Sequence, residues 1–298
     1  MRVFVTGATG FIGSAIVREL LDAGHQVLGL ARSDKAAAAL TAVGAEVHRG
    51  SLDDLDSLRS GASAADGVIH TAYTIISDTT DYAASSQADA RAIEAMGEAL
   101  EGTNRPFVVT SVTSLLASDG SQISTEDTPI SKAHFRAVGE EMALSFAARG
   151  VRVSVIRLPS SVHDADDTGF VPSLISIARS KGVSAYVGDG TNRWPAVHRL
   201  DAANLYRLAL EAAPAGAKLH AVSDEGIAIR DIAEVIGRNL SLPMLSITLQ
   251  EAGGHFAWLS RFVALDHPAS SALTRQQLGW HPVHPLLIAD MERVYFAN

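Results

Sequence analysis

Short apolar runs alternate with amphipathic segments along the first half of the chain. The runs are rich in Val and Ile and predict strands at 3–6, 26–31, 46–48, 67–71, 106–110 and 151–157. Between them, apolar residues recur at helical spacing at 12–23, 34–43, 55–60, 89–101 and 129–149. Such alternation predicts right-handed crossovers and a parallel sheet covered on both faces. The predicted fold class is therefore α/β, with a doubly wound parallel sheet.

The second half of the chain has a looser pattern, in which Pro and Gly mark loops. Apolar spacing predicts helices at 170–180 and 201–212, and a strand at 218–222 that extends the sheet. We predict a sheet domain at 1–157 that is completed by 187–222. A smaller, mixed C-terminal cap is expected at 158–186 and 223–298, with the ligand in the crevice between the two parts.

Composition narrows the class of partner. The 298 residues are 47% hydrophobic, enough for a sizeable core, and the formal net charge is -9 with a pI near 5.6. A negative net charge argues against nucleic acid and anionic membrane surfaces as partners. There is no cysteine, which excludes disulfides, thiolate metal sites and a cysteine nucleophile. The chain starts directly on a strand-like pattern and has no apolar run of membrane-spanning length, so we predict a cytoplasmic protein with a small-molecule substrate.

A glycine-rich turn lies between the first strand and the first helix, in the sequence VFVTGATGFIGSAIVREL. Gly7 allows the tight turn, Gly10 lets the backbone approach a pyrophosphate, and Gly13 lets helix and strand pack closely. The start of the helix offers free N–H groups and a positive dipole end to the phosphates. The strand, turn and helix together predict a dinucleotide-binding Rossmann domain, although the spacing is GxxGxxG rather than GxGxxG.

The end of the second strand indicates which dinucleotide binds. An NAD site usually has an acidic residue here to bind the ribose diol, whereas this chain has Arg32 followed by Ser33. A guanidinium beside a hydroxyl suits a 2′-phosphate, which favours NADP(H) over NAD(H). After the third strand, GSLDD offers Asp53 to the adenine amine, with a helix cap before Leu55 as the alternative.

Several segments together resemble the extended and atypical short-chain dehydrogenase/reductase superfamily, which includes the NAD-dependent epimerase/dehydratases. They are TGATGFIGS, GSLDD, GVIHTAY, PFVVTS, RLPSSVH, RWPAVHRLDAANLYRLALE and LGWHP, and they span most of the chain. The resemblance implies a cofactor site formed by Gly7, Thr9, Gly10, Phe11, Ile12, Gly13, Arg32, Ser33, Ser51, Leu52, Asp53, Thr71, Ala72, Arg136 and Pro159.

The resemblance also implies a Tyr, a Lys four residues later on the same helix, and a Ser or Thr at the end of the preceding strand. Counting back from Arg157, Lys132 takes the Tyr position and Arg136 the Lys position, so both are expected on one helical face toward the cofactor. A rival register, which places Thr128 at the Tyr position, supplies no tyrosine either. On the strand, Val112 replaces the usual hydroxyl residue, with Thr113 next to it. The triad is therefore nonstandard, and Lys132, Arg136 and Thr113 are its candidate members.

Other side chains offer substitutes for the missing phenol. Tyr73 follows the fourth strand at the carboxyl edge, where it serves either as an acid or in stacking, and His163 borders the implied substrate site. His198 has the same two interpretations as His163, catalytic or structural, while His70 is interpreted as structural. Arg193 and Trp194 are either an anion site or a surface pair and a core residue. The histidines show no metal-ligand spacing, so no metal is predicted.

The leading hypothesis is an NADP(H)-dependent oxidoreductase of the short-chain dehydrogenase/reductase type that acts on a small carbonyl or alcohol. The alternatives are a noncatalytic NADP(H)-binding redox or metabolite sensor, and a nucleotide-sugar epimerase or dehydratase. The resemblance implies a homodimer through the Ala-rich helices that carry AIEAMGEAL and EEMALSFAA, and a monomer remains the alternative.

Overall fold

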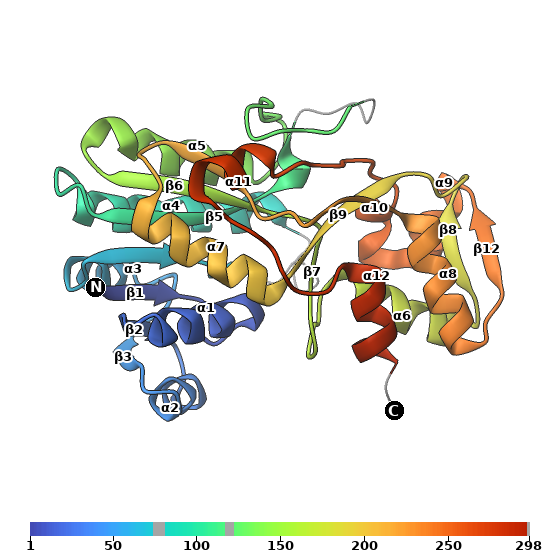
Figure 1. Ribbon diagram of the computed structural model, residues 1–298, viewed down its shortest axis with the longest axis horizontal. Helices are drawn as coiled ribbons and strands as arrows, with labels where there is room; N and C mark the ends of the chain where they lie inside the picture. The colour runs from blue at the N-terminus through green and yellow to red at the C-terminus, as the bar shows by residue number, and fades with distance from the viewer. Residues whose placement is uncertain (74–80, 117–121, 297–298) are drawn as a thin grey trace.

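A seven-stranded sheet forms the larger lobe of the molecule, on the left of Figure 1. The computed structural model describes residues 1–73, 81–116 and 122–296. The strand order is β10-β6-β5-β4-β1-β2-β3, and every neighbouring pair is parallel. The strands are β1 Arg2–Thr6, β2 Gln26–Ala31, β3 Glu46–Arg49, β4 Gly67–His70, β5 Pro106–Val112, β6 Arg152–Leu158 and β10 Ala217–His220. The predicted doubly wound α/β fold is confirmed, and the strand expected at 218–222 adds to the sheet.

Helices cover both faces of this sheet. Alternate residues of a strand point to opposite faces, and the strands accordingly supply two separate apolar clusters. One cluster is covered by α1 Phe11–Asp22 and α7 Arg199–Ala212, and the other by α3 Leu55–Ser63, α4 Tyr82–Leu100 and α5 Ala137–Ser145. The short helix α2 Asp34–Ala42 lies beside β3 at the sheet edge (Figure 1).

The helix predicted at 129–149 is shorter than expected. α5 begins only at Ala137 and continues through the 3-10 segment η3 Phe146–Arg149. Before it, Ile130 forms a β-bridge with Leu116, which holds the chain extended. The backbone N–H of Arg136 then donates to Nδ1 of His134, 3.2 Å away, in a turn. Lys132 therefore lies in this turn and does not share a helical face with Arg136, contrary to the prediction.

A smaller lobe carries its own apolar cluster, centred on Trp194 and Phe256. Its helices are α6 Phe170–Lys181, α8 Ile229–Leu240, α9 Leu249–Phe256, α10 Ser260–Val263 and α12 Leu287–Asp290, followed by the π-helical turn η5 Met291–Tyr295. Two small sheets complete it, with β12 Met244–Ile247 paired to β8 Ser184–Val187, and β9 Arg193–His198 between β11 Asp224–Ala228 and β7 Ser161–His163. β7 and β9 lie between the two lobes in Figure 1.

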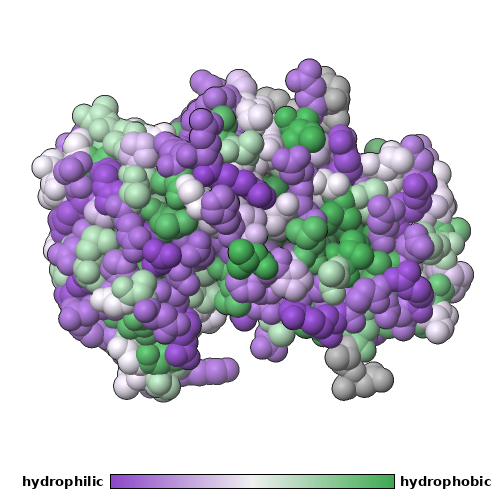
Figure 2. Space-filling view, in the orientation of Figure 1, coloured by the Kyte–Doolittle hydropathy of each residue, from purple (hydrophilic) through white to green (hydrophobic). Residues whose placement is uncertain are grey.

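The face drawn in Figure 2 is mainly polar, and its largest apolar patch lies over the smaller lobe. The most exposed large apolar side chains of the described residues are Leu245, Leu249, Val283 and Leu286. Among the helices that the structure describes, none combines the length and hydropathy needed to cross a bilayer.

A buried ion pair fixes α5 to the sheet. Nη2 of Arg157 on β6 donates to a Glu140 carboxylate oxygen at 2.6 Å, and both side chains are 1% exposed. Nη1 of Arg157 also donates to the Glu126 carbonyl oxygen at 3.1 Å and lies 3.2 Å from Nε2 of His220 on β10. Glu140 is therefore a core residue of the sheet domain, although it is charged.

Candidate active site

The glycine-rich turn connects β1 to α1 at the carboxyl edge of the sheet. Gly7 has φ +69°, and a Cβ there would lie 2.6 Å from Thr71 Oγ1. A Cβ on Gly13 would lie 2.0 Å from the Gly7 carbonyl oxygen. Any larger residue at this position would therefore prevent α1 from packing closely against the turn. A Cβ on Gly10 would meet only that carbonyl oxygen, at 3.2 Å. The fold thus requires Gly7 and Gly13, while Gly10 leaves space above a helix N-terminus that suits an anion.

The end of β2 places Arg32 on the surface. Its side chain is exposed and has no ion-pair partner among the residues that the structure describes. Ser33 is the N-cap of α2, since its hydroxyl accepts the backbone N–H of Ala36 at 3.2 Å. Asp54, not Asp53, caps α3, so the alternative role considered for Asp53 is absent. Arg32 and Asp53 are both available to a ligand.

A chain of buried polar side chains runs beneath the glycine-rich turn. Oγ1 of Thr6 lies 2.7 Å from Nδ1 of His70, and Nε2 of His70 lies 3.0 Å from Oδ1 of Asp89. Oδ2 of Asp89 pairs with Nη1 of Arg136 at 3.3 Å. An ionised Asp89 accepts the Nε2–H of His70, which leaves Nδ1 to accept the Thr6 hydroxyl. This network connects the end of β1 to the N-terminus of α5.

Arg136 is buried and closely packed. Its guanidinium lies 3.8 Å from the centroid of the Tyr73 ring, and its Nη2 donates to the Thr110 carbonyl oxygen at 2.8 Å. Nη1 is ion-paired with Asp89 but makes no hydrogen bond to the described residues, and the buried hydroxyls of Ser111 and Thr113 at the end of β5 make none to them either. Because such atoms cost free energy when left unpaired, they are suited to hydrogen bonds with a ligand. Polar groups that fit the sugar of a dinucleotide are therefore present at this edge.

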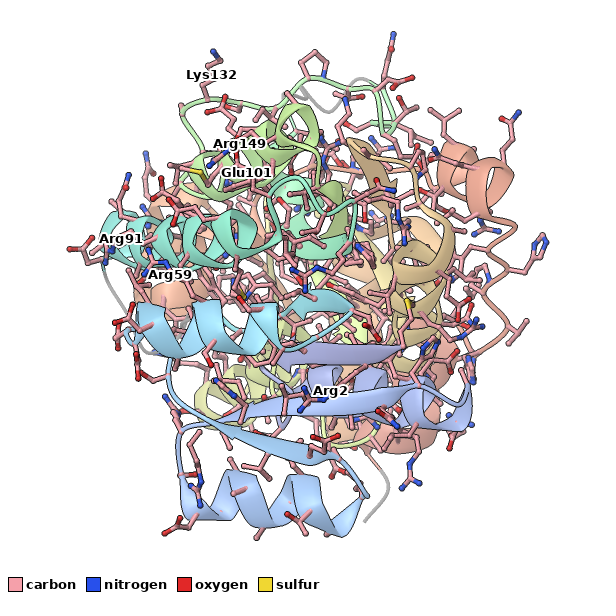
Figure 3. All side chains as sticks on the ribbon, turned by 90° about the vertical axis from the view of Figure 1, so that its left-hand side faces the viewer. Arg2, Arg59, Arg91, Glu101, Lys132 and Arg149 are labelled. Carbon is pink, nitrogen blue, oxygen red and sulfur yellow. The ribbon has the colours of Figure 1, made fainter. Side chains whose placement is uncertain are left out.

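The three predicted proton donors lie apart from one another. Lys132 is exposed and points away from the molecule (Figure 3). The Tyr73 hydroxyl is 2.9 Å from Ser86 Oγ, and His163 is fully buried with Nδ1 2.9 Å from Oδ2 of Asp290. Among the described contacts of the predicted catalytic residues, Tyr73 packs directly against Arg136.

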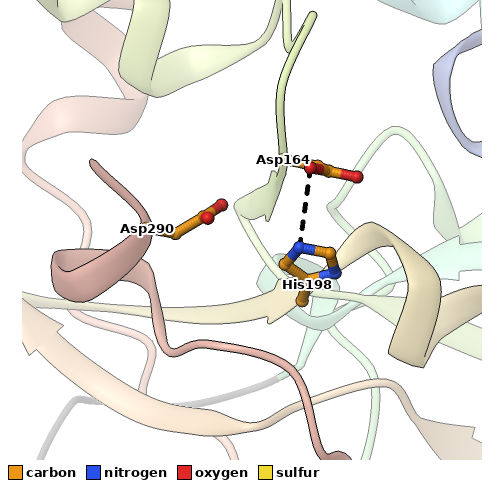
Figure 4. Close-up of side chains that lie close together, drawn as sticks. All are labelled: Asp164, His198 and Asp290. Atoms are coloured by element: carbon orange, nitrogen blue, oxygen red, sulfur yellow. Dashed lines mark ion pairs between the residues drawn. The ribbon is translucent and has the colours of Figure 1, made fainter. Parts of the chain in front are cut away.

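His198 belongs to a cluster at the junction of β7, β9 and α12 (Figure 4). Three possible ligand atoms lie within 4.8 Å of one another here, one from each of Asp164, His198 and Asp290. This spacing suggests a metal site. Nδ1 of His198 accepts the backbone N–H of Leu200 at 3.2 Å, which leaves the proton of the neutral ring on Nε2. Burial lowers the pKa of His198, which favours this neutral form.

Cations already compensate both carboxylates of this cluster. Arg199 pairs with Asp164, and Arg293 pairs with Asp290, each at 3.0 Å. A protonated Nε2 on His198 cannot bind a metal ion, so the arrangement fits a hydrogen-bonded junction better than a metal centre. His198 additionally caps α7, which agrees with the structural alternative for this residue.

Arg193 and Trp194 take the second of their two predicted roles. Arg193 forms hydrogen bonds through Nε and Nη2 to the Asp266 carboxylate, both at 3.0 Å. Trp194 is fully buried in the core of the smaller lobe. Neither is presented to a ligand as an anion site.

The other predicted cofactor residues lie along the carboxyl edge of the sheet. They are Thr9, Phe11 and Ile12 in or after the glycine-rich turn, Ser51 and Leu52 after β3, Thr71 and Ala72 after β4, and Pro159 after β6. The start of α7 contributes a contact that the sequence did not reveal, because the Arg199 guanidinium lies 4.6 Å from the Phe11 ring centroid.

Asp89 is a further residue that sequence reasoning missed. It shares a helical face with the buried residues Ile93 and Met96, and this spacing of a carboxylate among apolar positions was a usable signal. A Cβ on Gly139 would lie 2.9 Å from Oδ2 of Asp89, so Gly139 lets α5 approach this carboxylate.

Comparison with protein families adds an independent finding. The family described as "NAD dependent epimerase/dehydratase family" matches residues 3–223. An uncharacterized protein of Schizosaccharomyces pombe is 52% identical over 98% of both chains. A 4-hydroxy-2-methyl-3-oxo-4-farnesyl-3,4-dihydroquinoline-1-oxide ketoreductase of Stigmatella aurantiaca is 30% identical over 61% of this chain and 56% of its own.

Solved structures show the same fold. A dTDP-glucose 4,6-dehydratase from Streptomyces venezuelae, determined with NAD bound, has a TM-score of 0.79. The match covers 98% of this chain and 97% of that one, at 18% sequence identity. At this identity the likeness concerns the fold alone.

Proposed function

Since the chain belongs to the NAD-dependent epimerase/dehydratase family, whose members bind NAD(P), we propose that it is an NADP(H)-dependent oxidoreductase acting on a small carbonyl or alcohol. The unpaired Arg32 at the end of β2 carries this proposal, since it takes the place of the acidic residue that binds the NAD ribose. The similar ketoreductase supports carbonyl chemistry. When bound, the nicotinamide supplies hydride transfer.

The residues of the chain would bind and orient the reactants. The glycine-rich turn and the N-terminus of α1 receive the pyrophosphate, and Arg32 with Ser33 receives the 2′-phosphate. Asp89 pairs with Nη1 of Arg136 and holds the guanidinium at the edge of the sheet where the sugar would bind. Arg136 cannot serve as the proton acid, because a guanidinium keeps its proton at neutral pH.

Replacing Arg32 tests the choice of cofactor. We expect Arg32→Ala to weaken NADPH binding by about 10- to 100-fold, because charge-assisted hydrogen bonds contribute roughly 1.5–3 kcal/mol. NADH affinity should change less than twofold by the same estimate, since NADH has no 2′-phosphate. Titration of nicotinamide fluorescence measures both constants. Arg91→Ala, at an exposed site on α4, removes the same charge as a control. Tighter NADH than NADPH binding in the unmodified protein would contradict the assignment.

Replacing Gly10 tests the phosphate site separately from the fold. The added methyl group of Gly10→Ala meets only the Gly7 carbonyl oxygen, at 3.2 Å, so the thermal midpoint should move by no more than a few degrees. It occupies space that the pyrophosphate needs, and we expect cofactor affinity to fall by at least about tenfold, or 1.4 kcal/mol. Calorimetry and the same titration measure the two effects. Unchanged affinity would exclude a phosphate at this turn.

A noncatalytic NADP(H) sensor is the second candidate. The observation that favours it is the placement of Lys132, Tyr73 and His163, because none of them is free and directed toward Arg136. A partner that binds differently with NADPH and NADP⁺, without any turnover, would support the sensor. Nicotinamide retained through purification would instead favour an epimerase or dehydratase.

A further inference from the structure

Ser160 and His267 form a hydrogen-bonded pair that joins the two lobes. Oγ of Ser160, between β6 and β7, lies 2.7 Å from Nε2 of His267. Ser160 is half-buried and His267 is 7% exposed. The backbone N–H of His267 donates to the Arg193 carbonyl oxygen at 3.2 Å, which holds this part of the chain beside β9. A half-buried serine thus has its hydroxyl hydrogen-bonded to a buried imidazole.

The pair lies at the edge where the candidate active site is formed. Val112 at the end of β5 is in register with Leu158 at the end of β6, two residues before Ser160. Ser160 therefore emerges beside the segment that carries the unpaired Thr113 hydroxyl. Parallel strands bind ligands at this carboxyl edge.

Electrostatic contacts join the same pair to α5. The Arg136 charge helps to lower the pKa of His134, after burial, and the His134 charge contributes in the same way to the lowered pKa of His267. The backbone N–H of Arg136 donates to Nδ1 of His134 at 3.2 Å, so these two residues are neighbours at the start of α5.

We propose that Ser160 exchanges the proton of the substrate oxygen and that His267 accepts it through Ser160. The inference rests on the proposed oxidoreductase function and supplies the donor that it lacks. Tyr73 and His163 bond to Ser86 and Asp290, whereas the Ser160 hydroxyl bonds to His267 and has no further partner among the described residues.

The step balances in the direction of alcohol oxidation. The alcohol O–H bond breaks as its proton moves to Oγ of Ser160, and the Ser160 proton moves to Nε2 of His267. The substrate C–H bond breaks at the same time, and its hydride carries two electrons to the nicotinamide of NADP⁺. The products are a carbonyl compound, NADPH and an imidazolium. Because burial lowers the pKa of His267 to about 4, the imidazolium releases its proton to solvent at neutral pH, and reduction begins with the uptake of a proton by His267. Nε2 accepts the proton only in the tautomer with hydrogen on Nδ1.

Nitrogen-15 NMR of histidine-labelled full-length protein tests the pair without any substrate. At pH 7 we expect His267 as the neutral Nδ1–H tautomer, with an Nε2 resonance that shifts in Ser160→Ala. Ser161→Ala is the matched control, because the neighbouring Ser161 hydroxyl is buried without a hydrogen-bond partner. An Nε2–H tautomer, or an Nε2 resonance unaffected by Ser160→Ala, overturns the proposal.

Kinetics then test the role of the pair, with 1-phenylethanol and NADP⁺ or 9,10-phenanthrenequinone and NADPH as probes. Ser160→Ala and His267→Gln should lower kcat about 100-fold or more while the cofactor Kd and the substrate KM stay within twofold. Ser160→Thr, which keeps the hydroxyl, should restore most of kcat. Retained kcat in Ser160→Ala overturns the proposal. An unmodified protein that binds no nicotinamide cofactor contradicts the proposed function instead, and the NMR result still decides whether the pair exists.

Discussion

Glu140→Ala is expected to lower the free energy of unfolding by about 3–5 kcal/mol. Glu140 and Arg157 are each 1% exposed, and removal of the carboxylate leaves the Arg157 guanidinium buried without its anionic partner. The Glu126 carbonyl oxygen remains as an acceptor at 3.1 Å, but it carries no full charge. Urea denaturation measures the loss, which is a large part of the stability of a typical domain.

Two further variants make this result specific. Glu141→Ala changes the next residue, which is exposed on the same helix. It should lower the free energy of unfolding by less than about 0.5 kcal/mol. The double variant Glu140→Leu with Arg157→Met replaces both charges by apolar groups and should recover most of the loss. A loss below about 1 kcal/mol in Glu140→Ala would contradict the burial of the pair.

Acid is expected to destabilise the protein through its buried histidines. Burial lowers the pKa of His220 and of His267 to about 4, whereas a histidine in the unfolded chain titrates near 6.5. Between these values the unfolded state binds more protons, so stability is complete above about pH 6.5 and falls as the pH decreases toward 4. Each histidine should lower the free energy of unfolding by roughly 2–3 kcal/mol when the pH is reduced to 4.5.

Two carboxyl groups act in the opposite direction. Burial raises the pKa of Asp167 and of Asp224, so the folded state takes up their protons first and gains stability as the pH falls. Thermal unfolding between pH 7 and 4.5 measures the net effect. His220→Gln should flatten the profile, and His281→Gln, at an exposed site, should leave it unchanged. Identical profiles for the unmodified protein and His220→Gln would exclude a contribution from a buried neutral His220.

The sequence was informative where one local pattern determines the structure. Gly7 and Gly13 sit between an apolar strand and an amphipathic helix, and the close approach of Gly13 to the Gly7 backbone follows directly from that order. Alternating strands and helices likewise determined the parallel sheet. The start of α5 was mispredicted because a tertiary contact, the bridge between Leu116 and Ile130, overrides helical spacing.

The sequence pattern did not predict which side chains pair across the molecule. Ser160 and His267 are 107 positions apart, and no spacing rule relates a loop after β6 to a loop after α10. The Tyr73 phenol and the Arg136 guanidinium were each predicted near the site, but their stacking follows from how the segment after β4 lies against the start of α5. Pairings of this kind depend on the register of packed elements, which a single sequence does not specify.

The place of β10 in the sheet has a consequence for biosynthesis. β10 pairs with β6, although β7 to β9 and their connections to the smaller lobe lie between the two in the chain. A nascent chain that ends at residue 157 leaves β6 as an unprotected edge and leaves Arg157 without His220. β10 can therefore cover β6 only after the chain through His220 has left the ribosome. Until then β6 is open to pairing with a strand of another chain.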